Sequence, residues 1–561
     1  CNDGGIRWLC AAPDGRHARL CDAPGDSWRL TVYRAGFTTP AWFRIGVMYQ
    51  IFPDRFARDS SATAQRGMEH HRRMGQTVHC HGGWDEPVEW QANTPEGEYA
   101  PVDFYGGTLR GIADRLHYLQ KLGVTVLYLN PIFESASNHR YDTGDYRKVD
   151  PILGTNADFK KLCAAAADCG IRIVLDGVFA HTGADSRYFN RFRHYPGCGA
   201  YNSRSSVYAR WYSFAHYPDD YKCWWDFKDL PAVNAANPDW RKYMITGERS
   251  IVKTWLRDGA SGWRLDVADE LPDDVLRGMR SAAKETDPDS VLLGEVWEDA
   301  VTKVSYGERR QYALGDALDS VMNYPLRDGL VTFLTGRSTA RALADLLLSQ
   351  RLNYPRPLYY ALMNLTASHD VARTRSALAL DFDPRSRTRA ELAALEITDA
   401  MAARGAQLQV LAAAVQFWLP GIPSIYYGDE TGMQGLCDPF NRAPLQMCDT
   451  QMLQWYAQLT ALRHAHPALT RGEVAVFAPA GDVLCVLRVI ADGRDAFGEE
   501  AEDEALLLTV NRAAHPVRCH VELTCPGAGL CEETRLAFVR SEYDCAADCT
   551  DDTHIAIHDG V

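Results

Sequence analysis

The chain alternates short apolar runs with segments of helical periodicity through most of its length, and this alternation restricts the folds it can adopt. The runs are dense in β-branched and aliphatic residues, as in strands buried on both faces. Between two of them, Leu109, Ile112, Leu116 and Leu119 follow helical spacing, and Gly123 stands where a helix C-terminus expects glycine. Eight such runs predict an α/β fold, a (β/α)8 TIM barrel of parallel strands. The candidates are residues 46–52, 124–131, 171–179, 262–267, 291–297, 320–324, 362–368 and 422–427.

One connection in this pattern is far longer than a barrel needs. Roughly 80 residues separate the third and fourth strand candidates, whereas connections in α/β units are usually short. We expect the extra residues, at about 183–237, to form an inserted domain. After about residue 470 the period becomes two, as at 474–477 and 483–489, which predicts a C-terminal antiparallel β-sandwich with a solvated acidic loop at 499–504.

Charge and cysteine usage bear on partners and location. A formal net charge of −14 and a pI near 5.7 argue against a nucleic-acid partner, because phosphate binding needs a basic surface. No run of roughly 18 apolar residues occurs, so no membrane partner is expected. Sixteen cysteines without a CxxC pair favour free thiols in the cytoplasm. Because the chain starts at Cys1, secretion after removal of a leader is the alternative, and the cysteines at 519–549 leave disulfides or a metal open.

Three acidic residues stand at the ends of apolar runs: Asp266, Glu295 and Asp370. A carboxylate that ends a buried barrel strand lies on the face where barrel enzymes hold their active sites. Any one of them could be a helix cap or an ion-pair partner. Three together, each next to a basic or aromatic residue, favour a catalytic site.

Carboxylates in this arrangement suit the cleavage of an acetal. That reaction needs a proton on the leaving oxygen and negative charge opposite an oxocarbenium-like carbon. Two carboxyls about 5–5.5 Å apart give a covalent intermediate and retention of configuration. Arg264 precedes Asp266 by two positions, so both side chains point to one face of the strand, and we expect the guanidinium to keep this aspartate ionised.

Histidines and aromatic residues accompany the acids. His181 lies two residues after the third run and His369 directly precedes Asp370, so both are candidate donors to sugar hydroxyls. The histidines and cysteine at 70–81 look like metal ligands, but ordinary loop histidines are the favoured interpretation. The aromatic cluster at 221–227 is interpreted as partly a small core and partly a wall for stacking sugars.

These segments resemble the α-amylase family of glycoside hydrolases (family 13), in particular its neopullulanase-, cyclomaltodextrinase- and amylopullulanase-like members. The resemblance covers roughly residues 30–470 and rests on eight motifs in the family's order. They are Tyr-Gln-Ile-Phe-Pro-Asp-Arg-Phe at 49–56, Asn-His-Arg-Tyr-Asp-Thr-Gly-Asp-Tyr at 138–146, Asp-Gly-Val-Phe-Ala-His at 176–181, Leu-Pro-Ala-Val-Asn at 230–234, Gly-Trp-Arg-Leu-Asp-Val-Ala-Asp-Glu at 262–270, Gly-Glu-Val-Trp at 294–297, Ser-His-Asp at 368–370 and Gly-Ile-Pro-Ser-Ile-Tyr-Tyr-Gly-Asp-Glu at 421–430.

The resemblance implies a role for each matching residue. Asp266 would be the nucleophile, Glu295 the general acid/base and Asp370 the stabiliser of the transition state. Tyr141 would stack on the sugar at the cleavage site. The remaining substrate-binding residues, implied to hydrogen-bond that sugar, order the carboxylates or line the same pocket, are His139, His181, Arg264, His369, Asp438 and Arg442.

Two positions depart from the family's pattern. Many amylases have a calcium-ligating asparagine where this chain has Ala180, and a methyl group cannot coordinate a hard cation. We therefore expect no required cofactor and no metal-binding residue; a structural calcium is the alternative, although Ala180 argues against the usual site. Asp269 stands where neopullulanase-like members often carry asparagine, which leaves the contacts to the acceptor sugar open.

The expected domains follow from the resemblance. Residues 1–40 would be a remnant or linker of an N-terminal module, residues 41–470 the catalytic barrel with domain B at about 183–237, and residues 471–561 the C-terminal sandwich, short of its last strands. Either a natural variant or a truncated sequence explains the two ends, and the oligomeric state stays open.

The expected function is retaining hydrolysis of α-1,4-glucosidic bonds, and also of α-1,6 bonds in relatives that accept both. The substrate would be a starch-derived α-glucan, pullulan, a cyclodextrin or a maltooligosaccharide. An α-glucan transglycosylase is the first alternative, because a sugar hydroxyl can replace water in the second step. A non-catalytic binding subunit of the same family is the second, although such relatives usually lose the acids that this chain keeps.

Overall fold

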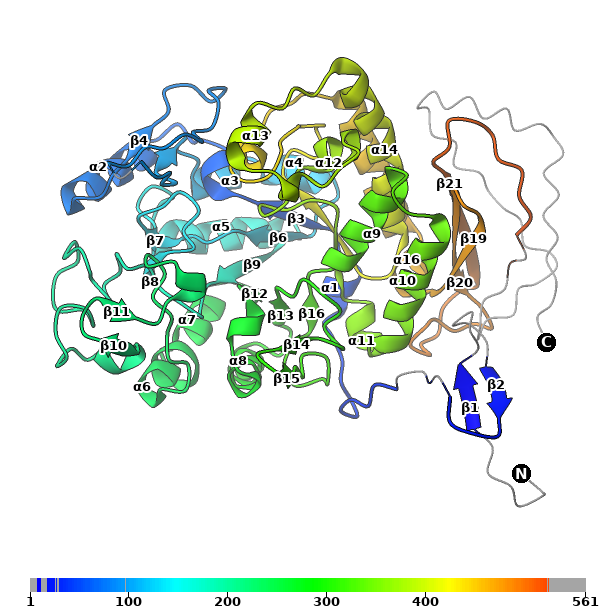
Figure 1. Cartoon of the computed structure of the whole chain (residues 1–561), viewed down its shortest axis with the longest axis horizontal. Coiled ribbons are helices and arrows are strands. Elements are labelled where there is room, and N and C mark those ends of the chain that lie inside the picture. Colours follow the sequence, from blue (N-terminus) through cyan, green and yellow to red (C-terminus); the bar gives the residue numbers. More distant parts are fainter. Residues whose placement is uncertain are drawn as a thin grey trace.

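The computed structural model describes residues 8–11, 18–25, 27, 30–95, 97–521 and 523, and its centre is a ring of parallel strands (Figure 1). The sheet has eight strands in the order β16-β13-β12-β9-β6-β3-β18-β17. A parallel bridge between Met322 and Met363 joins its two end strands and closes the ring. The prediction of a (β/α)8 barrel is confirmed, and every predicted run contains a strand. The strands are β3 (Met48–Ile51), β6 (Val126–Leu129), β9 (Arg172–Gly177), β12 (Gly262–Leu265), β13 (Val291–Gly294), β16 (Ser320–Val321), β17 (Met363–Leu365) and β18 (Ile422–Tyr426).

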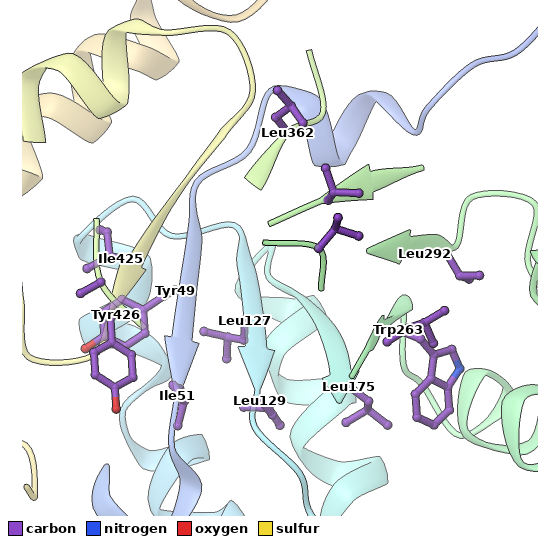
Figure 2. Close-up of a cluster of buried hydrophobic side chains, with 14 of the residues drawn as sticks. Tyr49, Ile51, Leu127, Leu129, Leu175, Trp263, Leu292, Leu362, Ile425 and Tyr426 are labelled. Carbon is purple, nitrogen blue, oxygen red and sulfur yellow. The ribbon is translucent and has the colours of Figure 1, made fainter. Parts of the chain in front are cut away.

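The strands divide their side chains between two apolar layers, because successive residues point to opposite faces. One layer packs inside the ring and includes Met48, Val126 and Leu293. The other packs between the ring and the helices, and Figure 2 shows part of it, including Leu129 and Trp263. Polar residues that share the inward register therefore enter the interior of the barrel, where burial forces them to pair with one another.

Helices cover the outside of the ring. The helix predicted at 109–119 is present as two short helices that meet at Arg115, and Gly123 beyond them has a φ of 84°, which glycine adopts without strain. Thr155 and Asp158 form a reciprocal capping box at the start of the next helix. The covering helices are α3 (Leu109–Asp114), α4 (Leu116–Lys121), α5 (Asn156–Asp168), α7 (Ile251–Arg257), α8 (Asp273–Thr286), α9 (Tyr324–Leu334), α10 (Ala340–Asn353), α12 (Thr374–Ala379), α14 (Asp399–Trp418) and α15 (Thr450–Ala465).

Four connections after barrel strands carry structure of their own. The chain between β9 and α6 (Pro238–Arg241) contains the hairpin β10 (Phe214–His216) and β11 (Asp220–Tyr221), in the region expected as domain B. In Figure 1 this insert and α2 (Thr63–Met74) lie at the same end of the molecule, and Gln76 donates to Asp185 across 2.8 Å between them. The sequence did not predict the paired strands β4 (His79–Cys80) and β5 (Asp103–Phe104), or the hairpins of β7 (Phe133–Ser135) with β8 (Thr143–Val149) and of β14 (Val304–Ser305) with β15 (Glu308–Arg309).

The C-terminal region contains the expected antiparallel pairing. Strands β19 (Glu473–Ala480), β20 (Val483–Ile490) and β21 (Glu504–Asn511) form one sheet that packs on α10, α14 and α16 (Pro467–Arg471). The described residues contain this one sheet, and the rest of the predicted sandwich falls on residues outside the described ranges. The acidic loop is not wholly solvated as expected, because Glu504 starts β21 and accepts from the backbone N–H of Ala468 at 2.8 Å.

Two further segments precede the first barrel strand. A hairpin of β1 (Trp8–Ala11) and β2 (Ala18–Cys21) lies near the N-terminus. Residues 30–40 reach the barrel, where Arg34 pairs with Asp316 at 2.9 Å and the Thr31 hydroxyl donates to the Asn353 carbonyl at 2.6 Å. Within the described part of the chain, no helix is long and apolar enough to span a membrane.

A buried arginine holds the end of the barrel opposite the carboxyl ends of its strands. Arg463 is 1% exposed and donates to the backbone carbonyls of Gly46, Arg44 and Gly421, among others. We expect Arg463→Met to lower the free energy of unfolding by about 3–5 kcal/mol, because it leaves several buried carbonyls without donors. Urea denaturation measures the change. The control Arg387→Met removes an exposed arginine paired with Glu391 at 3.7 Å and should cost under about 0.5 kcal/mol; equal losses in the two variants would contradict the prediction.

Candidate active site

The three predicted acids lie together at the carboxyl ends of the barrel strands. Asp266 directly follows β12, Glu295 directly follows β13, and Asp370 lies in the turn after β17. Asp266 and Glu295 are each 6% exposed, while the side chain of Asp370 is 26% exposed. Parallel strands bring their carboxyl ends to one face of a barrel, so residues more than 100 positions apart in sequence meet there.

Arg264 holds the two carboxylates that follow β12 and β13. Its Nη1 donates to Asp266 Oδ1 at 2.8 Å, and its Nη2 lies 2.9 Å from Glu295 Oε2 in an ion-pair contact without hydrogen-bond alignment. The guanidinium is fully buried, and Nη1 also donates to Asp176 Oδ1 at 2.9 Å. The carboxylates of Asp266 and Glu295 therefore contact the two terminal nitrogens of the planar Arg264 guanidinium, which limits the distance between them.

The backbone after Asp266 adds a second link between these carboxylates. Val267 adopts a φ of 37°, an uncommon and strained conformation for a β-branched residue. In this turn its N–H donates to Glu295 Oε2 at 2.7 Å. The strained turn thus holds the Glu295 carboxylate close to Asp266, which directly precedes Val267 in the chain.

The expectation that Arg264 keeps Asp266 ionised is not supported. Burial raises the pKa of Asp266 well above its usual value; the charges of Glu295 and Asp176 raise it further, while Arg264 lowers it. One guanidinium cannot offset three buried carboxylates, so the ionisation of Asp266 is opposed rather than favoured. The surroundings of Asp266 therefore favour its protonated form more than water does.

An aromatic pair connects Glu295 with Asp370. Trp297 donates its Nε1–H to Glu295 Oε1 at 3.0 Å, and Tyr324 donates its hydroxyl to Asp370 Oδ2 at 3.2 Å. The two rings are stacked, with centroids 3.9 Å apart and planes inclined by 4°. The sequence analysis missed both rings. Trp297 could have been found, because it lies two positions after Glu295, whereas Tyr324 gave no signal beyond its position after β16.

Tyr141 and His369 form a second layer of contacts. The Tyr141 hydroxyl donates to Asp176 Oδ2 at 2.9 Å and lies 2.5 Å from His369 Nε2, and the two rings stack at 5.2 Å. Gln50 Nε2 donates to His369 Nδ1 at 2.9 Å, so Nε2 carries the ring proton. Burial, with the charges of Arg264 and Arg442, lowers the pKa of His369 well below its usual value, which keeps the ring neutral.

The other two predicted histidines flank Tyr141. His139 accepts from the backbone N–H of Tyr141 at 3.0 Å through Nδ1, which leaves its Nε2–H as a donor. His181 Nε2 lies 3.2 Å from the Tyr141 carbonyl and donates to it, while Nδ1 has no hydrogen-bond partner among the described residues. Burial lowers the pKa of His181 to about 4 and holds that of His139 well below its usual value. Both rings are therefore neutral hydrogen-bonding groups at neutral pH.

Arg442 supports the backbone next to Asp370. Its Nε and Nη2 donate to the His369 carbonyl at 3.1 and 3.0 Å, and its Nη1 pairs with Asp438 at 3.0 Å. Every predicted site residue thus belongs to one continuous set of contacts. The contacts also include buried polar residues that the sequence analysis did not assign to the site, on inward-facing or strand-end positions: Gln50, Tyr128, Asn130 and Asp176.

The histidines at 70–81 pair with carboxylates. Ala180 contributes only a methyl group. His71 contacts Asp150 at 3.3 Å, His79 contacts Glu89 at 3.1 Å, and His81 contacts Asp103 at 3.2 Å, so the three histidines contact three different carboxylates. No group of three or more His, Cys, Asp or Glu side chains in the described ranges is arranged to hold a metal ion.

Comparison with known proteins gives one consistent result. The family model for the α-amylase catalytic domain matches residues 50–452. An amylopullulanase from Thermoanaerobacterium saccharolyticum is 35% identical over 552 residues, which cover 91% of this chain and 41% of the relative. A cyclomaltodextrinase from Geobacillus thermopakistaniensis is 32% identical over 489 residues, or 85% of this chain and 70% of the relative.

Solved structures agree with the sequence comparisons. The cyclic α-maltosyl-(1→6)-maltose hydrolase of Arthrobacter globiformis superposes with a TM-score of 0.64 at 29% identity, over 84% of this chain and 99% of that one. A cyclomaltodextrinase structure gives a TM-score of 0.65 at 29% identity, over 85% and 71%. The chain spans only 28–41% of the length of the amylopullulanases it matches.

The raised pKa of Asp266 makes a prediction about stability. A carboxyl with a folded pKa above its unfolded one contributes stability below the unfolded pKa, and this is lost as pH rises through the folded pKa. Asp266→Asn should therefore be more stable than the wild type at pH 7, and the difference should vanish near pH 4. Urea denaturation at both pH values measures it.

Glu391 provides a control of opposite sign. Hydrogen bonds from the backbone N–H and side chain of Thr388 lower its pKa, so its contribution is present above the unfolded pKa and lost on acidification. Glu391→Gln should be less stable than the wild type at pH 7. A destabilised Asp266→Asn variant at pH 7 would show that the paired Arg264 outweighs burial.

Proposed function

Because this chain belongs to the α-amylase family of glycoside hydrolases, we propose that it cleaves α-1,4-glucosidic bonds of starch-derived glucans by double displacement with retention of configuration. The observation that carries the proposal is the placement of Asp266 and Glu295 on the two terminal nitrogens of Arg264. A retaining mechanism needs one carboxylate on each side of the glycosidic bond, close enough to act on one sugar carbon.

In the first step, the Asp266 carboxylate attacks the anomeric carbon and forms a glycosyl ester. The bond to the leaving oxygen breaks, and Glu295 gives that oxygen its proton. Arg264 lies against both groups and stabilises the negative charge that moves from Asp266 to Glu295. Because the ionisation of Asp266 is opposed by burial, its carboxylate is poorly stabilised in the resting site and gains by forming a neutral ester.

In the second step, water replaces the leaving sugar. Glu295, now ionised, removes a proton from the water as its oxygen attacks the anomeric carbon, and the ester bond to Asp266 breaks. Two inversions give the α-anomer as product. Trp297 holds Oε1 of Glu295 through a hydrogen bond of 3.0 Å, which keeps the group aligned while it changes from acid to base.

Asp370, His369 and Tyr141 would hold the sugar at the cleavage site. Asp370 is the most exposed of the three acids, and its carboxylate is held by the Tyr324 hydroxyl at Oδ2 and by His369 Nε2, 3.2 Å from Oδ1, so that its exposed side can accept from sugar hydroxyls. The neutral histidines donate or accept single hydrogen bonds, while the Tyr141 ring offers a flat apolar face to the sugar. Strong fixation of the reacting ring is needed because catalysis depends on alignment within a fraction of an ångström.

The substrate range is a further part of the proposal. The relatives carry the names amylopullulanase, cyclomaltodextrinase and neopullulanase, so cleavage of α-1,6 bonds in pullulan and opening of cyclodextrins are included. We propose a cytoplasmic location, since the cysteines of the described chain are free thiols and Cys80, Cys198 and Cys448 are exposed.

Substitution of the two central carboxyls separates their roles. Asp266→Asn should lower kcat at least about 10³-fold on maltotriose and on an aryl α-maltoside, because the nucleophile is lost for both. Glu295→Gln should lower kcat similarly on maltotriose but less for formation of the glycosyl-enzyme from the aryl glycoside, whose leaving group needs little proton assistance. Burst kinetics and product chromatography measure the two steps.

The control for these variants is Glu298→Gln, which removes a carboxylate whose side chain is 60% exposed and paired with Lys303. It should retain wild-type activity. Unchanged hydrolysis by Asp266→Asn would overturn the proposed function. Products longer than maltotriose at the start of the reaction would identify the enzyme as a transglycosylase.

The alanine at position 180 leads us to propose that catalysis needs no calcium. Activity on maltotriose should be unchanged after incubation with EDTA, because a methyl group cannot replace the oxygen ligand of a calcium ion. The assay is run with and without added Ca²⁺. Loss of activity in EDTA that Ca²⁺ restores would contradict this proposal without affecting the roles of the carboxyls.

A further inference from the structure

A small cavity lies beside the contact between α9 and α12. Its charged lining residues are Arg327 and Asp328 on α9, Arg337 three residues beyond that helix, and Asp383 and Arg385 after α12. None of these side chains contacts the catalytic acids. The cavity encloses about 250 Å³, less than the roughly 300–1,000 Å³ of sites for drug-sized ligands. It therefore suits a compact group of a few atoms.

Both carboxylates of the cavity are already paired with arginine. Asp383 accepts from Arg385 at both oxygens, with the shortest contact, from Nη2, at 2.7 Å. Asp328 accepts from Arg327 Nη1 at 2.7 Å through Oδ1 and from Arg385 Nη2 at 3.0 Å through Oδ2. Every carboxylate oxygen thus has a donor. With Arg337 the cavity has three guanidinium groups against two carboxylates, which leaves one positive charge without a countercharge.

Arg327 has donors that the protein does not use. The residue is 3% exposed, and Nη1 donates to Asp328. Nε is buried without a hydrogen-bond partner, and Nη2 has no partner among the described residues. The N–H groups of Nε and Nη2 point the same way along one edge of the guanidinium, the geometry that binds two oxygens of one anion. A buried donor without an acceptor costs free energy, which a bound oxygen would recover.

Arg337 supplies the positive charge that has no countercharge. The chain leaves α9 through Gly336, whose φ is 84°, and the backbone N–H of Arg337 then donates to the Thr332 carbonyl at 2.9 Å. The Arg337 side chain is exposed, and its Nε donates to the Thr335 hydroxyl at 2.9 Å. No carboxylate within the described ranges pairs with it. Its guanidinium is therefore available to an anion in the cavity.

We propose that this cavity binds a phosphate group, as inorganic phosphate or as the phosphate of a sugar monoester. Phosphate is compact, carries negative charge and offers several oxygens, so it can accept from the free edge of Arg327 and from Arg337 at once. A chloride ion has the charge but only one accepting centre. In a sugar monoester, the sugar would lie toward the solvent, because the cavity is too small to enclose it. This site is separate from the proposed hydrolysis and does not depend on it.

Calorimetric titration of the full chain tests the proposal without turnover. Inorganic phosphate and glucose 6-phosphate are titrated separately, at an ionic strength kept constant with sodium chloride. Glucose alone serves as the control for sugar binding at the active site. We expect saturable binding of phosphate with one site per chain. The net charge of −14 makes a general attraction of the surface for anions an unsuitable explanation of such binding.

Substitution of Arg337 locates the bound anion. In Arg337→Ala we expect the dissociation constant for inorganic phosphate to rise about tenfold, because one charge-assisted donor is lost. Arg337→Lys should have a smaller effect, since it keeps the charge and loses the fork. The matched control is Arg66→Ala on α2, an exposed arginine that likewise donates to a threonine hydroxyl, that of Thr63 at 3.3 Å. It should bind phosphate as the wild type does.

The outcomes distinguish the sources of the phosphate and the location of the site. Equal affinity for the two compounds supports recognition of the phosphate group alone, and tighter binding of glucose 6-phosphate supports a sugar monoester. Absence of saturable binding of either compound overturns the proposal. Phosphate binding that Arg337→Ala leaves unchanged, or that Arg66→Ala weakens equally, also overturns it, because the anion then binds elsewhere. None of these results bears on the proposed hydrolase.

Discussion

The buried guanidinium of Arg264 is the interaction on which the rest of the site depends. It lies inside the ring of strands, and Asp176, Asp266 and Glu295 surround it at 2.8–2.9 Å. Without a cation, three carboxylates could not be held in so small a buried volume, because the desolvation and repulsion of the charges would be too costly. With one cation for three acids, the charge is only partly balanced. Burial, together with the charges of Glu295 and Asp176, raises the pKa of Asp266, which suits a site that must hold one proton and pass it to a leaving group.

The closed barrel allows the fold to tolerate this concentration of buried charge. Its apolar interior and its outer helical layer are separate, so the polar residues that enter the ring near the carboxyl ends of the strands do not interrupt the packing outside. Residues in the loops after the barrel strands add further contacts to the three acids. The Trp297–Tyr324 stack connects Glu295 with Asp370, and the strained turn at Val267 connects Asp266 with Glu295. Each acid is thereby held by at least one neighbour that is not itself acidic.

The sequence predicts the strands and the acids well because both follow local rules. Buried parallel strands are apolar over short runs, and residues two positions apart share a face, so the pairing of Arg264 with Asp266 could be foreseen. Tyr324 and Gln50 could not, since their partners Asp370 and His369 lie on distant segments. The hairpin of β14 and β15 has strands of only two residues, too short for any period to be recognised. The net pKa shift of Asp266 could not be foreseen, because burial, which depends on the folded surroundings, raises the pKa, while Arg264 lowers it as predicted.

The central claim is that Asp266 forms a covalent bond to the sugar while Glu295 supplies the proton. It is tested most directly by trapping that bond with an activated fluorinated maltosyl substrate, whose second step is slow, followed by mass spectrometry of the digested protein. The predicted result is one added glycosyl group on the peptide that contains Asp266, and none in the Asp266→Asn variant. Glycosylation of another residue, or hydrolysis with inversion and no trapped ester, would contradict the claim.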